Sequence, residues 1–269
     1  MRELTTLSDS DMAQKPLIEL LQNLYPDYSK EKLRALVDCR EVKVNNETAV
    51  DYKQIYPTES TIAITKKQYV SRGGEKLEHA LKNFSFEVEN LVVIDAGSST
   101  GGFTDALLQH GASAVHAVDV GYNLLDYKLR QDNRVIVHER QNIMKVANFD
   151  PVADVAVADL SFRSITKAAA HILSLTTKKE MIALIKPQFE VAKNSKGFSG
   201  VVQNSTLLKE TLLKVYKDLA LEGVIVTNLI ESPIRGRKGN REFLAHLTKG
   251  ESSSTVQQII EKIESLLQP

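Results

Sequence analysis

The chain has 269 residues, of which 34 are basic and 34 are acidic, so its formal net charge is zero. This balance excludes a globally basic nucleic-acid-binding protein, and any affinity for nucleic acid must come from local patches. The single cysteine, Cys39, excludes an intramolecular disulfide framework. Because the sequence has neither a leader-like start nor an apolar run of about 18 residues, we expect a cytoplasmic protein without stable membrane association.

The first part of the chain predicts a small α+β domain. Residues 1–14 are polar and aperiodic, which is typical of a loose arm. Apolar residues repeat with helical spacing between Leu17 and Leu24, and Ser29 is a suitable N-cap for a second helix. Short strands are expected over residues 41–44 and 61–65. The expected boundaries are a domain over residues 1–65, a linker over 66–70 and a second domain over 71–269.

The second part of the chain alternates strand-like and helix-like segments, which is typical of a doubly wound, mostly parallel sheet. The expected strands lie at residues 91–96, 114–118, 135–138, 155–158, 181–185, 224–229 and 242–248. The expected helices lie near residues 102–110, 164–175, 204–222 and 254–267. A connection between parallel strands needs a dozen or more residues. The short connection before the last strand therefore predicts that this strand is antiparallel to its neighbour. The fold class is therefore α/β, with a seven-stranded, Rossmann-like sheet.

A small-residue loop follows the first strand of this sheet. It begins at Asp95 and continues through Gly97, Ser98, Ser99, Thr100, Gly101 and Gly102. The glycine spacing is wrong for a dinucleotide, and a carboxylate at Asp95 would repel a pyrophosphate but suits the cationic end of S-adenosylmethionine. Asp119 ends the next strand and is placed to accept hydrogen bonds from ribose hydroxyls. There are two alternatives. The loop belongs to a dehydrogenase, or it is a turn that binds no ligand and in which Asp95 caps the helix.

Polar residues also follow the later strands. Asn142 comes after the third strand and is a candidate adenine contact, with a solvated loop as the alternative. Asp159 ends the fourth strand and Lys186 ends the fifth, so both should face one crevice. A ribose 2′-hydroxyl is a poor nucleophile, and a lysine held near-neutral is able to remove its proton. The alternatives are a surface lysine and an aspartate that caps a loop.

Several motifs, in this order, resemble the TlyA (hemolysin A) family. They are Ser71–Leu77, Asp95–Phe103, Ala117–Tyr122, Asp159–Phe162, Lys186–Glu190 and Gly239–Phe243. The resemblance implies an FtsJ-like, class I methyltransferase domain that takes its methyl group from S-adenosylmethionine. It also implies a Lys-Asp-Lys-Glu tetrad, which falls here on Lys76, Asp159, Lys186 and Glu242. Without the resemblance, Lys76 is equally well a solvent-facing residue and Glu242 a surface partner of Arg241.

The segment Leu17–Ile64 resembles the RNA-binding domain of the ribosomal-protein S-four type, although the Arg-Leu-Asp entry to its first helix is missing. Candidate RNA-binding residues in this domain are Lys30, Arg34, Arg40 and Lys43. Further candidates are Lys66, Lys67, Arg72, Lys193, Lys196, Arg235, Arg237 and Lys238. Lysine and arginine on such a surface contact phosphates without reading the sequence. A solvated face of mixed charge is the alternative.

The family resemblance implies 2′-O-methylation of cytidine ribose in ribosomal RNA. The expected partners are ribosomal RNA or ribosomal subunits, and we expect no bound metal. The alternatives are methyl transfer to another RNA or another atom, and a membrane-active hemolysin.

Overall fold

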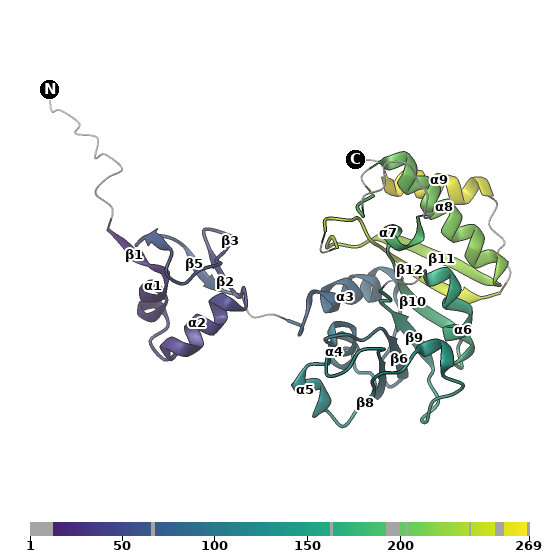
Figure 1. The fold of residues 1–269 in the computed structure, drawn as a ribbon, viewed down its shortest axis with the longest axis horizontal. Helices are drawn as coiled ribbons and strands as arrows, with labels where there is room; N and C mark the ends of the chain where they lie inside the picture. The colour runs from purple at the N-terminus through teal and green to yellow at the C-terminus, as the bar shows by residue number, and fades with distance from the viewer. Residues whose placement is uncertain are drawn as a thin grey trace. The chain divides into compact units, whose positions relative to one another are not determined.

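The computed structural model describes residues 13–65, 68–161, 164–191, 200–202, 204–236, 238–250 and 256–267. The chain divides into two compact units, Met1–Lys67 and Gln68–Pro269 (Figure 1).

The first unit is a small α+β fold. Its elements are β1 (Gln14–Pro16), α1 (Leu17–Leu24), α2 (Lys30–Asp38), β2 (Val42–Val44), β3 (Glu47–Thr48), β4 (Ile55–Pro57) and β5 (Ile62–Ile64). The side chain of Ser29 accepts a hydrogen bond from Lys32 N at 3.2 Å, which caps α2 as the sequence predicts. The strands form a two-stranded sheet, β1-β4, and a three-stranded sheet, β3-β2-β5. The two helices and the three-stranded sheet share a core of buried residues that include Leu21, Leu33 and Val44.

The loose arm expected over residues 1–14 is wrong at its last residue. Gln14 does not belong to a loose arm, because it begins β1 and lies opposite Pro57 of β4. Residues 1–12 lie outside the described part of the chain. The polar composition of the segment gave no strand signal, and the pairing depends on β4, which is about forty residues away.

A seven-stranded sheet organises the second unit, in the order β11-β12-β10-β9-β6-β7-β8. Its strands are β6 (Val92–Ala96), β7 (Ala114–Val118), β8 (Val135–His138), β9 (Val155–Ala158), β10 (Glu180–Ile185), β11 (Val224–Glu231) and β12 (Phe243–Lys249). Neighbours among β6 to β10 are parallel, whereas β12 is antiparallel to both β10 and β11. The predicted seven-stranded sheet with an antiparallel last strand is thus confirmed.

Helices cover both faces of this sheet (Figure 1). Their bounds are α3 (Arg72–Phe84), α4 (Gly102–Gln109), α5 (Tyr127–Arg130), α6 (Ala169–Ser174), α7 (Pro187–Glu190), α8 (Ser205–Leu221) and α9 (Val256–Leu267). Successive strand residues point to opposite faces, so Val93 packs with α3 and α4 while Ile94 packs with α6 and α8. The sheet is therefore buried on both sides, as a parallel sheet requires.

The helix predicted over 164–175 is interrupted. Residues Ile165–Lys167 form a 3-10 turn, and α6 begins only at Ala169. Ser164 accepts a hydrogen bond from Thr166 N, and Ala168 N donates to Ile165 O, so a separate turn closes before the helix begins.

The short helices α5 and α7 have no periodic apolar pattern and were not expected. Within the described residues, no helix has the length and apolar character needed to cross a bilayer.

The helix α8 offers a test of how the core stabilises the second unit. Leu219 is fully buried, whereas Leu221, two residues later, is 86% exposed. We expect Leu219→Ala to lower the free energy of unfolding by about 2–5 kcal/mol, because it leaves a cavity. The matched Leu221→Ala should change it by no more than about 0.5 kcal/mol. Urea unfolding of both variants checks this, and equal effects would contradict the assigned packing of α8.

Candidate active site

The predicted functional residues of the second unit gather at one edge of the sheet. Parallel strands end at this edge, and Gly97, Asp119, Asp159 and Lys186 each directly follow one of them. Glu242 reaches the same edge from the opposite direction, because it immediately precedes the antiparallel strand β12. Such an edge is where open α/β sheets bind ligands.

The loop after β6 is a tight cradle. Gly97 and Gly101 have φ angles of 88° and 94°, which are strained for residues with a side chain. Both Gly97 N and Ser98 N donate to Val118 O, at 2.8 and 3.1 Å, which anchors the loop to β7. A Cβ atom on Gly97 would lie 2.7 Å from the carbonyl oxygen of Asp159. The glycine therefore allows this loop and the loop after β9 to approach closely.

Asp95 lies beneath this cradle and is fully buried. Its Oδ2 accepts a hydrogen bond from Thr104 Oγ1 at 2.6 Å, while its Oδ1 has no hydrogen-bond partner among the described residues. Burial is the main cause that raises the pKa of Asp95 to about 7, with smaller contributions from the charges of Asp159 and Asp119 and an opposing effect of the hydrogen bond from Thr104. A buried acceptor of this kind is stabilised by a cationic ligand, so the cradle fits S-adenosylmethionine.

Asp119 shapes the neighbouring loop. Its Oδ2 accepts from Ser99 N at 2.9 Å and its Oδ1 accepts from Gly121 N at 2.7 Å. Each carboxylate oxygen has a further lone pair for a ligand hydroxyl. Asn142 lies in the loop after β8, where its Oδ1 accepts from Met144 N at 3.0 Å and caps a 3-10 turn. The structure thus gives Asn142 a capping contact that the sequence did not indicate.

Lys186 and Asp159 form an ion pair, with 2.5 Å between Lys186 Nζ and Asp159 Oδ1. The amine also donates to Ser161 Oγ at 3.3 Å. Both side chains are largely shielded from solvent, with exposed fractions of 11% for Lys186 and 26% for Asp159. The expectation that these two strand ends meet agrees with this geometry, and Lys186 is not a free surface lysine.

A second ion pair joins Lys76 of α3 to Glu242, with 2.5 Å between Lys76 Nζ and Glu242 Oε2. The residues are only 8% and 4% exposed. Lys76 is therefore not solvent-facing, and Glu242 is not a surface partner of Arg241, which instead pairs with Glu231. A buried pair is strongly coupled, because removing one partner leaves the other charge uncompensated.

Gln188 is a residue of this edge that the sequence reasoning missed. It lies two residues after Lys186 on α7, and its Nε2 donates to Glu242 Oε1 at 3.5 Å. Its Oε1 is buried without a hydrogen-bond partner among the described residues. Its position in the turn that follows a strand end could have indicated a site residue. Only the fold shows that this turn lies against Glu242.

The candidate RNA-binding cations fall in both units. Lys30, Arg40 and Lys43 are exposed, and Arg34 is half-buried with its guanidinium 5.2 Å from the centre of the Tyr52 ring. In the second unit, Arg72, Arg235 and Lys238 are exposed. The other candidates, Lys66, Lys67, Lys193, Lys196 and Arg237, lie outside the described residues.

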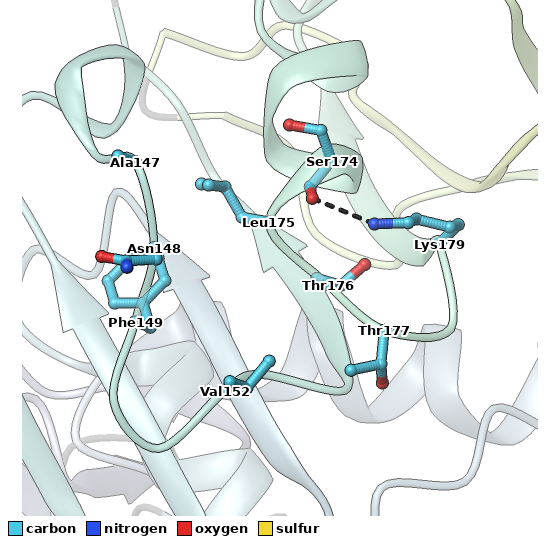
Figure 2. Close-up of a pocket in the computed structure, with 9 residues that line it drawn as sticks. All are labelled: Ala147, Asn148, Phe149, Val152, Ser174, Leu175, Thr176, Thr177 and Lys179. Carbon is cyan, nitrogen blue, oxygen red and sulfur yellow. Dashed lines mark hydrogen bonds between the residues drawn. The ribbon is translucent and has the colours of Figure 1, made fainter.

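A separate hollow lies at the opposite edge of the sheet, near the starts of β9 and β10 (Figure 2). Its lining residues include Phe149, Val152 and Thr176, and Lys179 donates to the carbonyl oxygen of Ser174 across it (Figure 2). None of the predicted site residues lines it. This hollow therefore takes no part in the candidate active site.

Among the described residues, no group of three or more His, Cys, Asp or Glu side chains is arranged to hold a metal ion.

The sheet order, the glycine cradle and the buried carboxylate together define a methyltransferase that uses S-adenosylmethionine. The model of the FtsJ-like methyltransferase family matches residues 69–249, and the chain belongs to this family. The resemblance inferred from the motifs is thereby confirmed.

Relatives support this assignment over most of their length. Hemolysin A from Brachyspira hyodysenteriae is 43% identical over 197 residues, which are 72% of this chain and 82% of that protein. TlyA from Mycobacterium tuberculosis, named as a ribosomal RNA cytidine-2′-O-methyltransferase, is 35% identical over 230 residues, which are 81% of this chain and 84% of that protein. A solved structure named "Putative hemolysin from Streptococcus thermophilus" has a TM-score of 0.70 and 33% identity, and the match covers 94% of this chain and 97% of that one.

The cradle predicts a specific effect of substitution at Gly97. In Gly97→Ala the new Cβ pushes against the backbone of Asp159, so we expect the affinity for S-adenosylhomocysteine to fall at least about tenfold, or 1.4 kcal/mol. The control is Gly223→Ala, where φ is also positive, at 68°, but nothing lies within 4 Å of the added Cβ. Isothermal titration of both variants measures the difference. Equal losses would mean that the substitutions act through a general effect on folding, and would contradict crowding of the cradle as the cause.

The raised pKa of Asp95 predicts a pH-dependent affinity for S-adenosylmethionine. As pH falls through about 7, Asp95 takes up a proton and loses its attraction for a cationic ligand. The affinity should therefore rise by up to about tenfold per pH unit between about pH 5 and pH 7, and then level off. Asp95→Asn should abolish this rise, whereas Asp154→Asn, at the opposite edge, should retain it. A pH-independent affinity in the unsubstituted enzyme would refute the interpretation.

Proposed function

We propose that this methyltransferase modifies the ribose 2′-hydroxyl of cytidine in ribosomal RNA. The observation that carries the proposal is the Lys186–Asp159 ion pair, which lies at the same sheet edge as the buried Lys76–Glu242 pair. Relatives that align over most of their length are named for this reaction. The proposal puts the enzyme in the cytoplasm with the ribosomal subunits.

The four charged residues have distinct roles in this proposal. In this proposal Lys186 first releases one proton of its ammonium group to solvent, and the amine then accepts the proton of the 2′-hydroxyl as that oxygen attacks, while Asp159 holds the amine in place. S-adenosylmethionine, when bound, supplies the electrophilic methyl group. Lys76 and Glu242 position the ribose from the other side of the edge, where their burial fixes both side chains. Gln188, hydrogen-bonded to Glu242, has a buried oxygen that is able to accept a hydrogen bond from the substrate.

The cofactor contacts follow from the cradle. The loop from Gly97 to Gly102, with Ser98, Ser99, Thr100 and Gly101 between them, approaches the methionine part of the cofactor. Asp95 and Asp159 provide negative charge for its cationic groups, and Asp119 accepts hydrogen bonds from its ribose. Asn142 borders the adenine. A ligand that carries positive charge offsets the cost of burying the Asp95 carboxylate.

RNA binding is assigned to the candidate cations of both units. In the first unit, which we propose to be an RNA-binding domain of the ribosomal-protein S-four type, these are Lys30, Arg34, Arg40 and Lys43. In the second unit they are Arg72, Arg235 and Lys238, which are exposed. The sequence adds Lys66 and Lys67 at the end of the first unit, and Lys193, Lys196 and Arg237 in the second. Contacts of this type position a phosphate backbone and weaken as salt is added. Specificity for the nucleotide therefore depends on the residues at the sheet edge.

The proposal predicts transfer of labelled methyl groups from S-adenosylmethionine to unmodified ribosomal subunits. Lys186→Ala should reduce this transfer at least about 100-fold, because general-base catalysis is lost, while cofactor affinity remains. The matched control is Lys82→Ala, which removes a lysine that is 67% exposed and paired on the surface of α3. Incorporation is measured by scintillation counting, and cofactor binding by titration.

The same assay separates the alternatives. A methylated 2′-oxygen protects the adjacent phosphodiester bond from alkaline hydrolysis, so label in alkali-resistant dinucleotides supports ribose methylation. Label in mononucleotides would move the reaction to the base. Transfer to other RNA but to neither ribosomal subunit would contradict the proposed substrate.

A further inference from the structure

Glu190 is a buried carboxylate that the mechanism does not use. It is the last residue of α7 and is only 4% exposed. Its Oε1 accepts a hydrogen bond from Ile165 N at 2.8 Å, and its Oε2 accepts one from the hydroxyl of Ser164. These partners belong to the segment after β9, so Glu190 joins two segments that are distant in sequence.

These two segments both begin with a proposed catalytic residue. The segment after β9 begins at Asp159 and reaches Ser164, and the segment after β10 begins at Lys186 and reaches Glu190. Their first residues are joined by the ion pair at 2.5 Å. Their far ends are joined by the two hydrogen bonds of Glu190. Residues 186–190 are one described turn of helix, so the two hydrogen bonds that hold Glu190 at its end constrain the position of Lys186 at its start.

This contact depends on a carboxylate, Glu190, whose burial is unfavourable. Burial raises the pKa of the Glu190 carboxyl, which shows that its charged form is poorly solvated, and the hydrogen bonds from Ser164 and Ile165 oppose this rise. On α8, Lys214 favours the charged form and Asp218 opposes it. Two donors on one segment are what such a carboxylate needs to remain buried. A side chain bound at both oxygens is held more firmly than one with a single contact.

We propose that Glu190 is a positioning residue that sets the geometry of the Lys186–Asp159 pair. Its effect on catalysis rests on the proposed function, but its effect on the side chain of Lys186 does not. Displacing a reacting group by about 1 Å costs roughly 100-fold in rate. One turn of helix separates Glu190 from Lys186, so loss of the two hydrogen bonds frees α7 to move the lysine.

The test compares Glu190→Ala, which removes both hydrogen bonds, with Glu190→Gln, which retains them. In the glutamine variant Oε1 still accepts from Ile165 N, and the amide donates to Ser164 Oγ. The control is Asp154→Ala, because Asp154 similarly accepts from a backbone amide (Val92 N, 3.0 Å) and a hydroxyl (Thr177 Oγ1, 3.1 Å), but at the opposite edge of the sheet.

Two readouts are measured on the full chain. The first is the acetylation rate of Lys186 by limiting acetic anhydride, followed by mass spectrometry, with the exposed Lys82 as internal standard. The second is the single-turnover rate of methyl transfer at saturating cofactor and RNA. For Glu190→Ala we expect several-fold faster acetylation of Lys186 and a methyl-transfer rate that is roughly tenfold to 100-fold lower, with cofactor affinity unchanged. Glu190→Gln and Asp154→Ala should resemble the unsubstituted enzyme in both readouts.

Each outcome decides a separate claim. If folded Glu190→Ala leaves the acetylation of Lys186 unchanged, the positioning role is wrong. If Glu190→Ala does not fold, Ser164→Ala, which removes one of the two bonds, replaces it and should show a smaller change in the same direction. An unsubstituted enzyme that transfers no methyl group to ribosomal RNA would overturn the proposed function, and the acetylation readout would then decide the role of Glu190 alone.

Discussion

The direction of a single strand determines the composition of the candidate active site. The strand β12 runs antiparallel between β10 and β11, so its first residue, Phe243, lies opposite the last residue of β10, Ile185. The residues just outside this pair, Glu242 and Lys186, therefore reach the same edge. In a parallel arrangement Glu242 would lie at the far edge, beside the hollow near Lys179, and could not meet Lys76.

The site consists of two ion pairs that differ in their surroundings. Lys76 and Glu242 are nearly inaccessible to solvent, which makes their pairing obligatory and their positions fixed. Asp159 is more exposed than these two residues. Lys186 pairs with Asp159 and also donates a hydrogen bond to the hydroxyl of Ser161. A proton acceptor has to reach the substrate, whereas a positioning pair has to remain in place. The two lysines are shielded alike, with side-chain exposures of 11% for Lys186 and 10% for Lys76, so burial distinguishes the pairs only through Asp159, at 26%, and Glu242, at 4%.

Periodicity and strand-end rules predicted much of this arrangement. Asp159 and Lys186 were placed at one crevice because residues after parallel strands share an edge. Lys76 and Glu242 could not be paired from spacing, because 166 residues separate them and their contact depends on how α3 packs against the sheet. Only the family resemblance indicated them. The helix predicted over 164–175 begins only at Ala169, because local hydrogen bonds of Ser164 and Ala168, which the apolar pattern does not reveal, close a separate turn before it.

The most direct test of the account is a crystal structure of the chain with S-adenosylhomocysteine. Convergence of strand ends predicts that the homocysteine part lies on the cradle at Gly97, that the ribose lies at Asp119, and that the sulfur faces Lys186. The Lys186–Asp159 pair should remain intact in that complex. A ligand bound in the hollow lined by Phe149 and Thr176, or a Lys186 side chain turned away from the sulfur, would contradict the account.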